Sequence, residues 1–214
     1  MTGAGAAEMV EKQLRARGIR DERVLRVMLT IPREEFVQPQ FQENAYADAP
    51  LPIGYGQTIT QPYMTALMIQ LLELTGTEKV LEVGAGSGYH AAVLGVLSRN
   101  VISVERIPEL AAIARENLRR NRLDGNVTVI CADGSDGVPD ERPFDAISVA
   151  AGSPEIPPAL LAQLSDPGVL VIPVGGRLDQ DLRVVQRKNG TITTRTASGC
   201  RFVPLVGRAG WQEN

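Results

Sequence analysis

Histidine and cysteine are scarce in this sequence of 214 residues, which has one histidine, His90, and two cysteines, Cys131 and Cys200. A zinc site built from these residue types needs about four of them close together, so the composition predicts no metal cofactor. It also leaves little material for a Ser–His or Cys–His catalytic pair. We expect both cysteines to be reduced thiols in the core and the chemistry of the protein to proceed without imidazole.

Long apolar runs and an excess of positive charge are also missing. No stretch approaches the roughly 20 apolar residues of a membrane span, and no basic flank followed by an apolar run suggests an export signal. Lysine and arginine number 22 against 25 acidic residues, a net charge of −3, whereas phosphate-binding proteins usually carry a basic excess. We expect a cytoplasmic protein with no membrane or nucleic-acid partner; its oligomeric state stays open, and a monomer fits the sequence.

The apolar residues follow a β–α pattern that predicts a doubly wound, mostly parallel seven-stranded α/β sheet. Short, nearly all-apolar strands alternating with helices are typical of a parallel sheet covered on both faces. Polar–apolar alternation around Asn189-Gly190 predicts that the sheet closes with an antiparallel hairpin. The expected strands span residues 79–83, 100–105, 126–131, 144–150, 169–174, 181–188 and 191–197, and the expected helices 62–76, 87–97, 108–121 and 158–164.

The residues ahead of this core predict a helical and loop extension. Residues 1–7 are small and polar and resemble a frayed tail. One helix is expected to end at Gly18, and a second to begin at the N-cap Asp21. Residues 36–62 show no period but include apolar and aromatic side chains, which favours an ordered, functional loop. The predicted organisation is a single domain over 1–214, with N-terminal helices and a substrate loop in 1–61 and the core in 62–214.

A glycine-rich segment, Val80-Leu-Glu-Val-Gly-Ala-Gly-Ser-Gly-Tyr89, joins a predicted buried strand to a helix. Glycines allow a sharp turn and let a ligand approach the main chain. The next strand ends in Glu105, about 20 residues further on, where a carboxylate can accept both hydrogen bonds from a ribose diol. Tyr89 stands where the dinucleotide fingerprint needs Gly or Ala. The segment therefore predicts a nucleoside ligand, the alternative being a tight turn in a fold that only shares the topology.

Two further carboxylates favour S-adenosylmethionine over a dinucleotide. Glu82 precedes the glycines, and at the mouth of the site it would suit the cationic amino-acid part of this molecule and repel a pyrophosphate. Asp133 ends the third strand, where it could accept a hydrogen bond from an adenine amino group.

Two segments carry a family resemblance. Val80–Tyr89 together with Val101-Ile-Ser-Val-Glu-Arg106 resembles class I S-adenosylmethionine-dependent methyltransferases, which implies a Rossmann-like fold. Leu51-Pro-Ile-Gly-Tyr-Gly-Gln-Thr-Ile-Thr-Gln-Pro-Tyr63 resembles the signature of the protein-L-isoaspartate O-methyltransferase family. Further matches at residues 144–149, 167–175 and 201–207 extend the similarity from about residue 9 to the end of the chain.

The resemblance implies methyl transfer from S-adenosylmethionine to the free α-carboxylate of L-isoaspartyl residues in damaged proteins, with D-aspartyl residues a lesser substrate in some members. The ester then cyclises to a succinimide, whose hydrolysis repairs part of the chain. A carboxylate is ionised at neutral pH and needs no base, so positioning and exclusion of water are the main tasks. The scarcity of histidine agrees with this chemistry.

The resemblance also implies roles for individual residues. Thr60 takes the place of the family's active-site hydroxyl, usually serine, and adds a methyl group and a stiffer χ1; from local sequence alone it could equally cap the helix at Pro62. Thr58 and Ile59 would help it to hold the substrate carboxylate. The third-strand motif begins with Ala132 where glycine is expected. Expected cofactor-binding residues are Glu82, Gly84, Ala85, Gly86, Ser87, Gly88, Glu105, Arg106, Asp133 and Gly134, and expected substrate-binding residues are Gln57, Val203, Pro204, Leu205 and Val206.

Some roles and two other functions stay open. His90 is expected at the surface or at the edge of the cofactor, and not as a catalyst. Residues 203–206 could be a plain edge strand or, by resemblance, lie beside an extended substrate peptide. A methyltransferase for RNA or a small molecule is disfavoured by the missing basic excess and by Ala150-Ala-Gly152, where an Asn-Pro-Pro-Tyr type motif would stand. A cofactor-binding homologue without catalysis is the other alternative.

Overall fold

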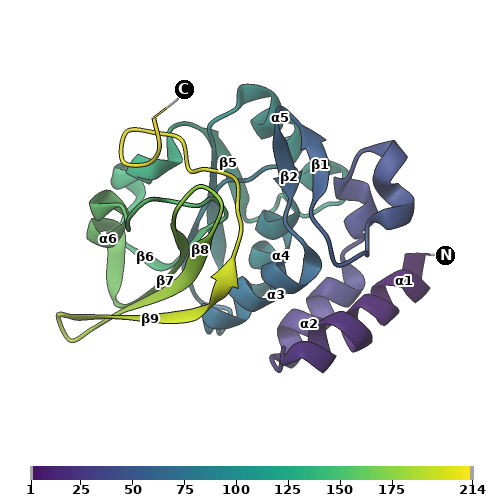
Figure 1. Cartoon of the computed structure of the whole chain (residues 1–214), viewed down its shortest axis with the longest axis horizontal. Coiled ribbons are helices and arrows are strands. Elements are labelled where there is room, and N and C mark those ends of the chain that lie inside the picture. The colour runs from purple at the N-terminus through teal and green to yellow at the C-terminus, as the bar shows by residue number, and fades with distance from the viewer. Residues whose placement is uncertain (1, 213–214) are drawn as a thin grey trace.

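A seven-stranded mixed sheet forms the centre of the protein in the computed structural model, which describes residues 2–212 (Figure 1). The strand order is β5-β4-β3-β6-β7-β8-β9. Neighbours from β5 to β7 are parallel, and β8 and β9 add to β7 as antiparallel strands. The strands are β3 (Lys79–Val83), β4 (Asn100–Glu105), β5 (Val127–Cys131), β6 (Phe144–Val149), β7 (Leu164–Gly175), β8 (Gln180–Lys188) and β9 (Thr191–Cys200).

This topology confirms the predicted doubly wound sheet and its closing hairpin. Asn189 and Gly190 both have positive φ, at 52° and 76°, which suits the tight two-residue turn between β8 and β9. The sequence placed the start of the fifth strand at residue 169, but β7 begins at Leu164, directly after a short helix.

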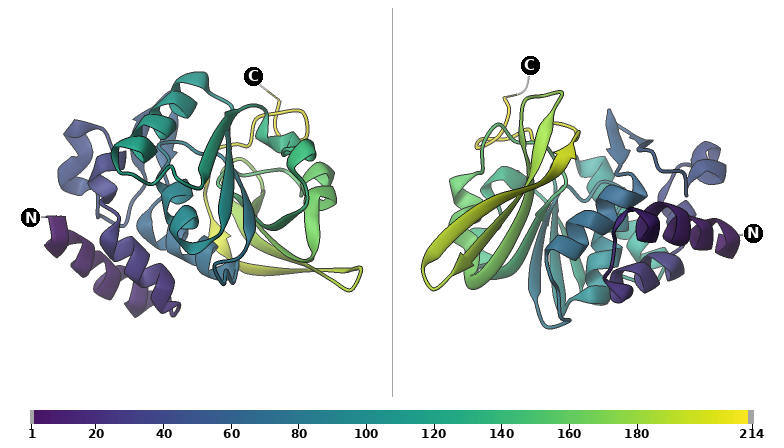
Figure 2. Two further views of the ribbon diagram at one scale, coloured as in Figure 1. Left: turned by 180° about the vertical axis from the view of Figure 1, so that it is seen from behind. Right: turned by 60° about the horizontal axis from the view of Figure 1, so that its bottom comes forward.

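Helices cover both faces of the sheet (Figure 2). Side chains alternate along each strand, so Val80 packs into one hydrophobic cluster with α3, α4 and α5, and Leu81 into a second cluster that includes Leu160 of α6. The near-continuous apolar strands follow from this double burial. The helices are α3 (Pro62–Leu71), α4 (Tyr89–Leu97), α5 (Pro108–Arg120) and α6 (Pro158–Gln163).

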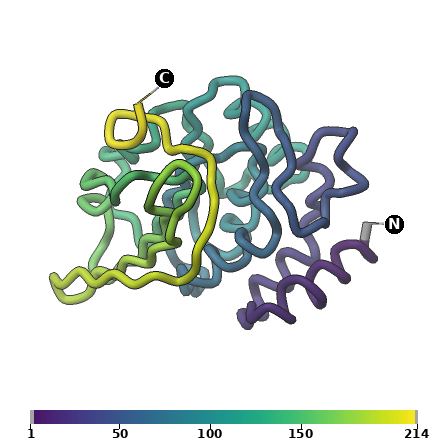
Figure 3. Tube along the Cα trace, in the orientation of Figure 1, coloured from purple at the N-terminus to yellow at the C-terminus, as the bar shows by residue number. Residues whose placement is uncertain are grey.

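The N-terminal residues form a helical layer beside this core (Figure 3). The predicted frayed tail is wrong for the described part, because α1 (Thr2–Glu8) is helical and buries Ala6; Met1 lies outside the described residues. The helical path continues to Gly18, where φ is +99°. As predicted, Asp21 caps α2 (Glu22–Thr30) by accepting hydrogen bonds from two backbone N–H groups. The helix propensity of these small residues could not show that α1 packs against the rest of the protein.

The predicted loop 36–62 is ordered, and it holds a hairpin that no periodicity indicated. β1 (Leu51–Gly54) and β2 (Gln57–Ile59) pair antiparallel, with Leu51 opposite Ile59. Tyr55 and Gly56 turn the chain with φ of 53° and 70°. The strands are too short, and too rich in glycine and proline, for a period of two to be visible in the sequence. Thr58 and Ile59 are thus placed on the second strand of an ordered hairpin.

Both cysteines are free thiols, as predicted, but neither lies in the core. Cys131 is exposed and Cys200 is partly exposed, because each is the last residue of an edge strand, β5 and β9. Among the described residues, no helix is both long and apolar enough to cross a membrane.

We expect Gly95→Ala to destabilise the protein. A Cβ at Gly95 in α4 would lie 2.6 Å from Cγ2 of Val127 on β5, and such overpacking costs about 1–3 kcal/mol. In an open helix the same change stabilises by roughly 0.5–1 kcal/mol. Urea unfolding should therefore show a lower free energy of unfolding. Gly3→Ala in α1, where a Cβ meets nothing within 4 Å, is the matched control, and equal stabilisation by both changes would contradict this packing.

Candidate active site

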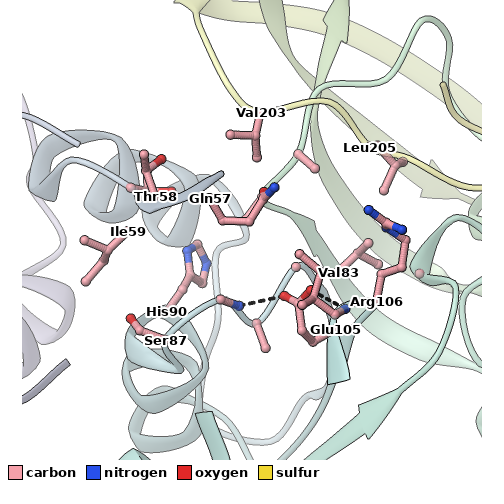
Figure 4. A pocket seen from close by; sticks show the side chains of 18 of the residues that line it. Gln57, Thr58, Ile59, Val83, Ser87, His90, Glu105, Arg106, Val203 and Leu205 are labelled. Carbon is pink, nitrogen blue, oxygen red and sulfur yellow. Dashed lines mark hydrogen bonds between the residues drawn. The ribbon is translucent and has the colours of Figure 1, made fainter. Parts of the chain in front are cut away.

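A pocket opens where the parallel strands end. Since the carboxyl ends of β3, β4 and β6 lie at one edge of the sheet, the loops that follow them meet there. The pocket encloses about 930 Å³ when the open space at its mouth is included. Its walls are the glycine loop after β3, the end of β4, the β2 strand and residues 203–206 (Figure 4).

The pocket brings together the residues predicted from the sequence, except for Glu82, Gly88 and Asp133. The residues that line it as predicted are Gln57, Thr58, Ile59, Thr60, Gly84, Ala85, Gly86, Ser87, Glu105, Arg106, Gly134, Val203, Pro204, Leu205 and Val206. The pocket is also lined by Thr65, Val83, Tyr89, His90, Val104, Ile107, Ala150 and Ala151.

Glu105 is held in place by the main chain around it. Its Oε2 accepts a hydrogen bond from the Gly86 N–H at 2.9 Å, and its Oε1 accepts one from the Ile107 N–H at 3.0 Å (Figure 4). A carboxylate oxygen can accept a second hydrogen bond. Glu105 can therefore still bind a diol, as the sequence predicted.

Gly88 serves packing and does not line the pocket. Its φ is +90°, and a Cβ there would lie 3.1 Å from the carbonyl oxygen of Ala114 in α5. Gly88 therefore lets the chain enter α4 close to α5, while Gly84 and Gly86 provide the open backbone of the pocket wall.

Glu82 does not lie at the mouth of the site, so its predicted role in binding the cationic part of S-adenosylmethionine is wrong. Its side chain is fully buried and accepts a hydrogen bond from the Ser103 hydroxyl. Burial raises the pKa of Glu82 to about 8, so the neutral acid predominates at pH 7. Strand alternation explains the placement: Val83 lines the pocket, and the preceding side chain turns to the other face of the sheet.

Asp133 also differs from its predicted role, because its carboxylate accepts hydrogen bonds from the protein chain itself. Oδ1 accepts hydrogen bonds from the N–H and hydroxyl of Ser135, and Oδ2 accepts one from the Arg208 N–H at 2.8 Å. Partial burial opposes ionisation, but these hydrogen bonds keep the pKa of Asp133 below its usual value. Asp133 therefore fastens the C-terminal segment beside the pocket, while its neighbour Gly134 lines it.

Thr60 lies on the pocket wall and is not a helix cap. The N-cap of α3 is Gln61, and no side chain there bonds to the helix. The Thr60 carbonyl accepts a hydrogen bond from Arg33 Nη2 at 2.7 Å. Within residues 2–212 the Thr60 hydroxyl makes no hydrogen bond, so it is available to a ligand.

Arg33 is a structural partner of the site that sequence reasoning missed. It is fully buried; Nε donates to the Ala45 carbonyl and Nη2 to the Thr60 carbonyl, each at 2.7 Å. The guanidinium lies 4.8 Å from the ring centroid of Tyr89. No carboxylate of the described residues pairs with it. A charged residue in a Pro-Arg-Glu-Glu run gives no sequence signal of burial.

His90 is buried in the pocket wall and not at the surface. Its Nε2 lies 3.2 Å from the Ser148 hydroxyl. Burial lowers the pKa of His90 to about 4, so the ring is neutral at pH 7. Its Nδ1 and the hydroxyls of Thr65, Ser87 and Tyr89 are buried without a hydrogen-bond partner. Buried polar atoms are nearly always paired, and these unpaired atoms all belong to residues that line the pocket.

Comparisons with known proteins agree on one family. A family model described as "Protein-L-isoaspartate(D-aspartate) O-methyltransferase (PCMT)" matches residues 5–210. Proteins named protein-L-isoaspartate O-methyltransferase are 51% identical in Koribacter versatilis, over 96% of this chain and 92% of theirs, and 52% identical in Methanoculleus marisnigri, over 96% and 93%.

Solved structures give the same result. A structure of a protein-L-isoaspartate O-methyltransferase covers 96% of this chain and 67% of its own, with 29% identity and a TM-score of 0.84. A Plasmodium falciparum protein assigned to the same enzyme family, in complex with S-adenosyl-L-homocysteine, covers 92% and 96%, with 30% identity and a TM-score of 0.79. The Rossmann-like methyltransferase fold is thereby confirmed.

Replacing the buried acid should change how stability depends on pH. Below pH 4.5, its ordinary pKa, Glu82 is protonated in folded and unfolded chains alike. Between pH 4.5 and 8 only the unfolded chain loses the proton, so stability falls as pH rises through that window. Glu82→Gln removes this loss, and its stability relative to wild type should rise by about 1–4 kcal/mol from pH 5 to 8.

Urea unfolding at a series of pH values measures this difference. The exposed Glu43→Gln is the matched control and should show no such gain. Parallel curves for Glu82→Gln and wild type would contradict a neutral buried acid.

Arg33→Met should lower the free energy of unfolding by roughly 2–4 kcal/mol, because it leaves two carbonyl groups without their donor. Chemical denaturation measures the change, and Arg26→Met on the exposed side of α2 is the control. If both variants unfold at the same urea concentration as wild type, Arg33 does not hold these segments together.

Proposed function

The chain belongs to the protein-L-isoaspartate(D-aspartate) O-methyltransferase family, and from that premise we propose how its pocket performs the family's reaction. The reaction is methyl transfer from S-adenosylmethionine to the free α-carboxylate of an L-isoaspartyl residue in a damaged protein, which begins repair through a succinimide. The observation that carries the proposal is the meeting of Glu105, the glycine loop and Thr58–Thr60 around one pocket.

The residues present fit the methyl donor. Glu105 keeps accepting capacity for a ribose diol, and the open backbone at Gly84 and Gly86 leaves room beside it. A Cβ at Gly86 would come within 3.1 Å of Cδ1 of Ile53 in β1, so a side chain there would fill the space between hairpin and loop. When bound, S-adenosylmethionine supplies an electrophilic methyl group on its sulfonium. We assign its nucleoside part to the Glu105 side of the pocket.

Thr58, Ile59 and Thr60 hold the substrate carboxylate in this proposal. They lie at the end of the β1–β2 hairpin, and Arg33 donates a hydrogen bond to the carbonyl of Thr60. The free hydroxyl of Thr60 and backbone N–H groups of residues 58–60 can donate to an anion, while the buried arginine makes this end of β2 electropositive. Because the substrate carboxylate is ionised at neutral pH, the residues need only align the nucleophile and exclude water.

Residues 203–206 offer a wall for the rest of the substrate. Val203 O and Leu205 N–H pair with Gly152, and Leu205 O accepts from the Trp211 N–H. Within residues 2–212 the Pro204 carbonyl and Val206 N–H make no hydrogen bond, which leaves main-chain groups for an extended peptide. Recognition through the main chain would let one enzyme accept many sequences. The cytoplasmic location, the absence of a nucleic-acid partner and the boundary at residues 61–62 stay predictions.

The decisive assay uses labelled S-adenosylmethionine with paired peptides that contain isoaspartate or aspartate at one position. Base-labile methyl esters should form on the isoaspartyl peptide alone. Equal labelling of both peptides would overturn the specificity, and base-stable label on RNA would indicate a different methyltransferase. Binding of S-adenosyl-L-homocysteine without turnover on any isoaspartyl peptide would indicate a homologue without catalysis.

Thr60→Val should reduce kcat/KM for an isoaspartyl peptide by roughly 10- to 100-fold, the effect of removing one hydrogen bond to a charged group. Affinity for S-adenosyl-L-homocysteine, measured by calorimetry, should change less than about two-fold. Thr128→Val, at an exposed position in β5, controls for the substitution itself. Equal losses of turnover and cofactor affinity would make Thr60 a structural residue.

A further inference from the structure

His90 lies in the pocket wall, and the family resemblance of the sequence assigned no role to it. Figure 4 shows its imidazole amid the side chains of Thr58, Ser87 and Glu105, the last of which stands at the end of β4. The residue is 7% exposed and comes from the first turn of α4, so it moves little relative to the loop. It lines the same pocket as Thr58–Thr60, the residues proposed to hold the substrate.

The two nitrogens of this ring have different surroundings. Nε2 is anchored on the Ser148 hydroxyl at 3.2 Å, whereas Nδ1 is buried and has no partner. A neutral imidazole has one donor and one acceptor nitrogen, and the partner of one nitrogen decides the role of the other. If Ser148 donates to Nε2, Nδ1 carries the proton and is a hydrogen-bond donor without an acceptor among the described residues.

A buried polar row beneath α4 favours that arrangement. Ser103, Glu82 and Ser148 are register neighbours on β4, β3 and β6, and all three are fully buried. Ser103 donates to Oε2 of Glu82, while Oε1 has no partner. Among the described residues Ser148 makes no side-chain hydrogen bond other than the one to His90, so its hydroxyl proton is available to Nε2.

We propose that Nδ1 of His90 donates a hydrogen bond to a carboxylate bound in the pocket. This proposal rests on the proposed function, in which the carboxylate has two possible sources. They are the amino-acid part of S-adenosylmethionine and the α-carboxylate of the isoaspartyl residue. The unpaired hydroxyl of Ser87 and the Thr60 hydroxyl, which makes no hydrogen bond within residues 2–212, belong to the same pocket. Glu105 already accepts hydrogen bonds from the Gly86 and Ile107 N–H groups.

The presence of one histidine in the chain makes the test direct. Protein labelled with ¹⁵N-histidine gives a single imidazole spectrum, recorded first for the protein alone. S-adenosyl-L-homocysteine and 5′-methylthioadenosine, which lacks the amino-acid part, are then added separately. An isoaspartyl peptide is added last, to the S-adenosyl-L-homocysteine complex.

We expect the tautomer with the proton on Nδ1 in the protein alone. A downfield shift of that proton with S-adenosyl-L-homocysteine, and none with 5′-methylthioadenosine, identifies the cofactor carboxylate as the partner. A shift that appears only with the peptide identifies the substrate carboxylate. The proton on Nε2, or no shift with either carboxylate, overturns the proposal. If neither nucleoside binds in parallel calorimetry, the proposed function itself fails.

Variants separate binding from a merely structural role. If the cofactor supplies the carboxylate, His90→Leu should weaken S-adenosyl-L-homocysteine binding about 5- to 30-fold and leave 5′-methylthioadenosine binding unchanged. If the substrate supplies it, KM for the peptide should rise by a similar factor. His90→Asn, whose amide can donate from a similar position, should restore part of the loss.

Ser148→Ala keeps the histidine and removes its anchor, so the protein should show both tautomers in its spectrum and an intermediate affinity. It also serves if His90→Leu does not fold. A structural histidine would alter stability in these variants but leave the ratio of the two nucleoside affinities and the peptide KM unchanged, and that result would overturn the proposal.

Discussion

The buried guanidinium of Arg33 joins parts of the protein that the chain builds separately. It donates to Ala45 in the N-terminal layer and to Thr60 at the end of the β1–β2 hairpin, and it stacks on Tyr89 at the start of α4. Removing such a charge from water is costly, and only fixed partners in all three segments offset that cost. The pocket wall on the Thr58–Thr60 side depends on this contact, because the short hairpin has no large core of its own.

The parts of the site that follow from the sheet could be predicted from sequence. Apolar strands at regular intervals define the parallel order, and parallel order brings the strand ends together. The places of Gly84, Gly86 and Glu105 in the pocket wall were therefore predictable from spacing alone, since Glu105 ends β4 and the two glycines lie in the loop after β3. Thr58–Thr60 and residues 203–206 were placed by family resemblance, because no local pattern links a short hairpin or an irregular segment to a strand end.

The failures have identifiable physical causes. Glu82 was assigned by its position before the glycines, but alternation along β3 directs its side chain beneath α4. Asp133 stands at a strand end, as a ligand-binding carboxylate would, but it is occupied by a hydrogen bond from a backbone N–H 75 residues further along the chain. The helix α1 consists of small residues whose propensity is unremarkable, and packing decides its structure. Long-range contacts of this kind leave no trace in a local window of sequence.

The contact between Asp133 and Arg208 makes the pocket depend on nearly the whole length of the chain. Glu105 and the glycine loop lie in the first half of the sequence, whereas Val203–Val206 belong to its last twelve residues. The Arg208 N–H bonded to Asp133 holds this last segment beside Gly134. A chain cut short directly after β9 would contain every strand of the seven-stranded sheet and still lack this wall of the pocket.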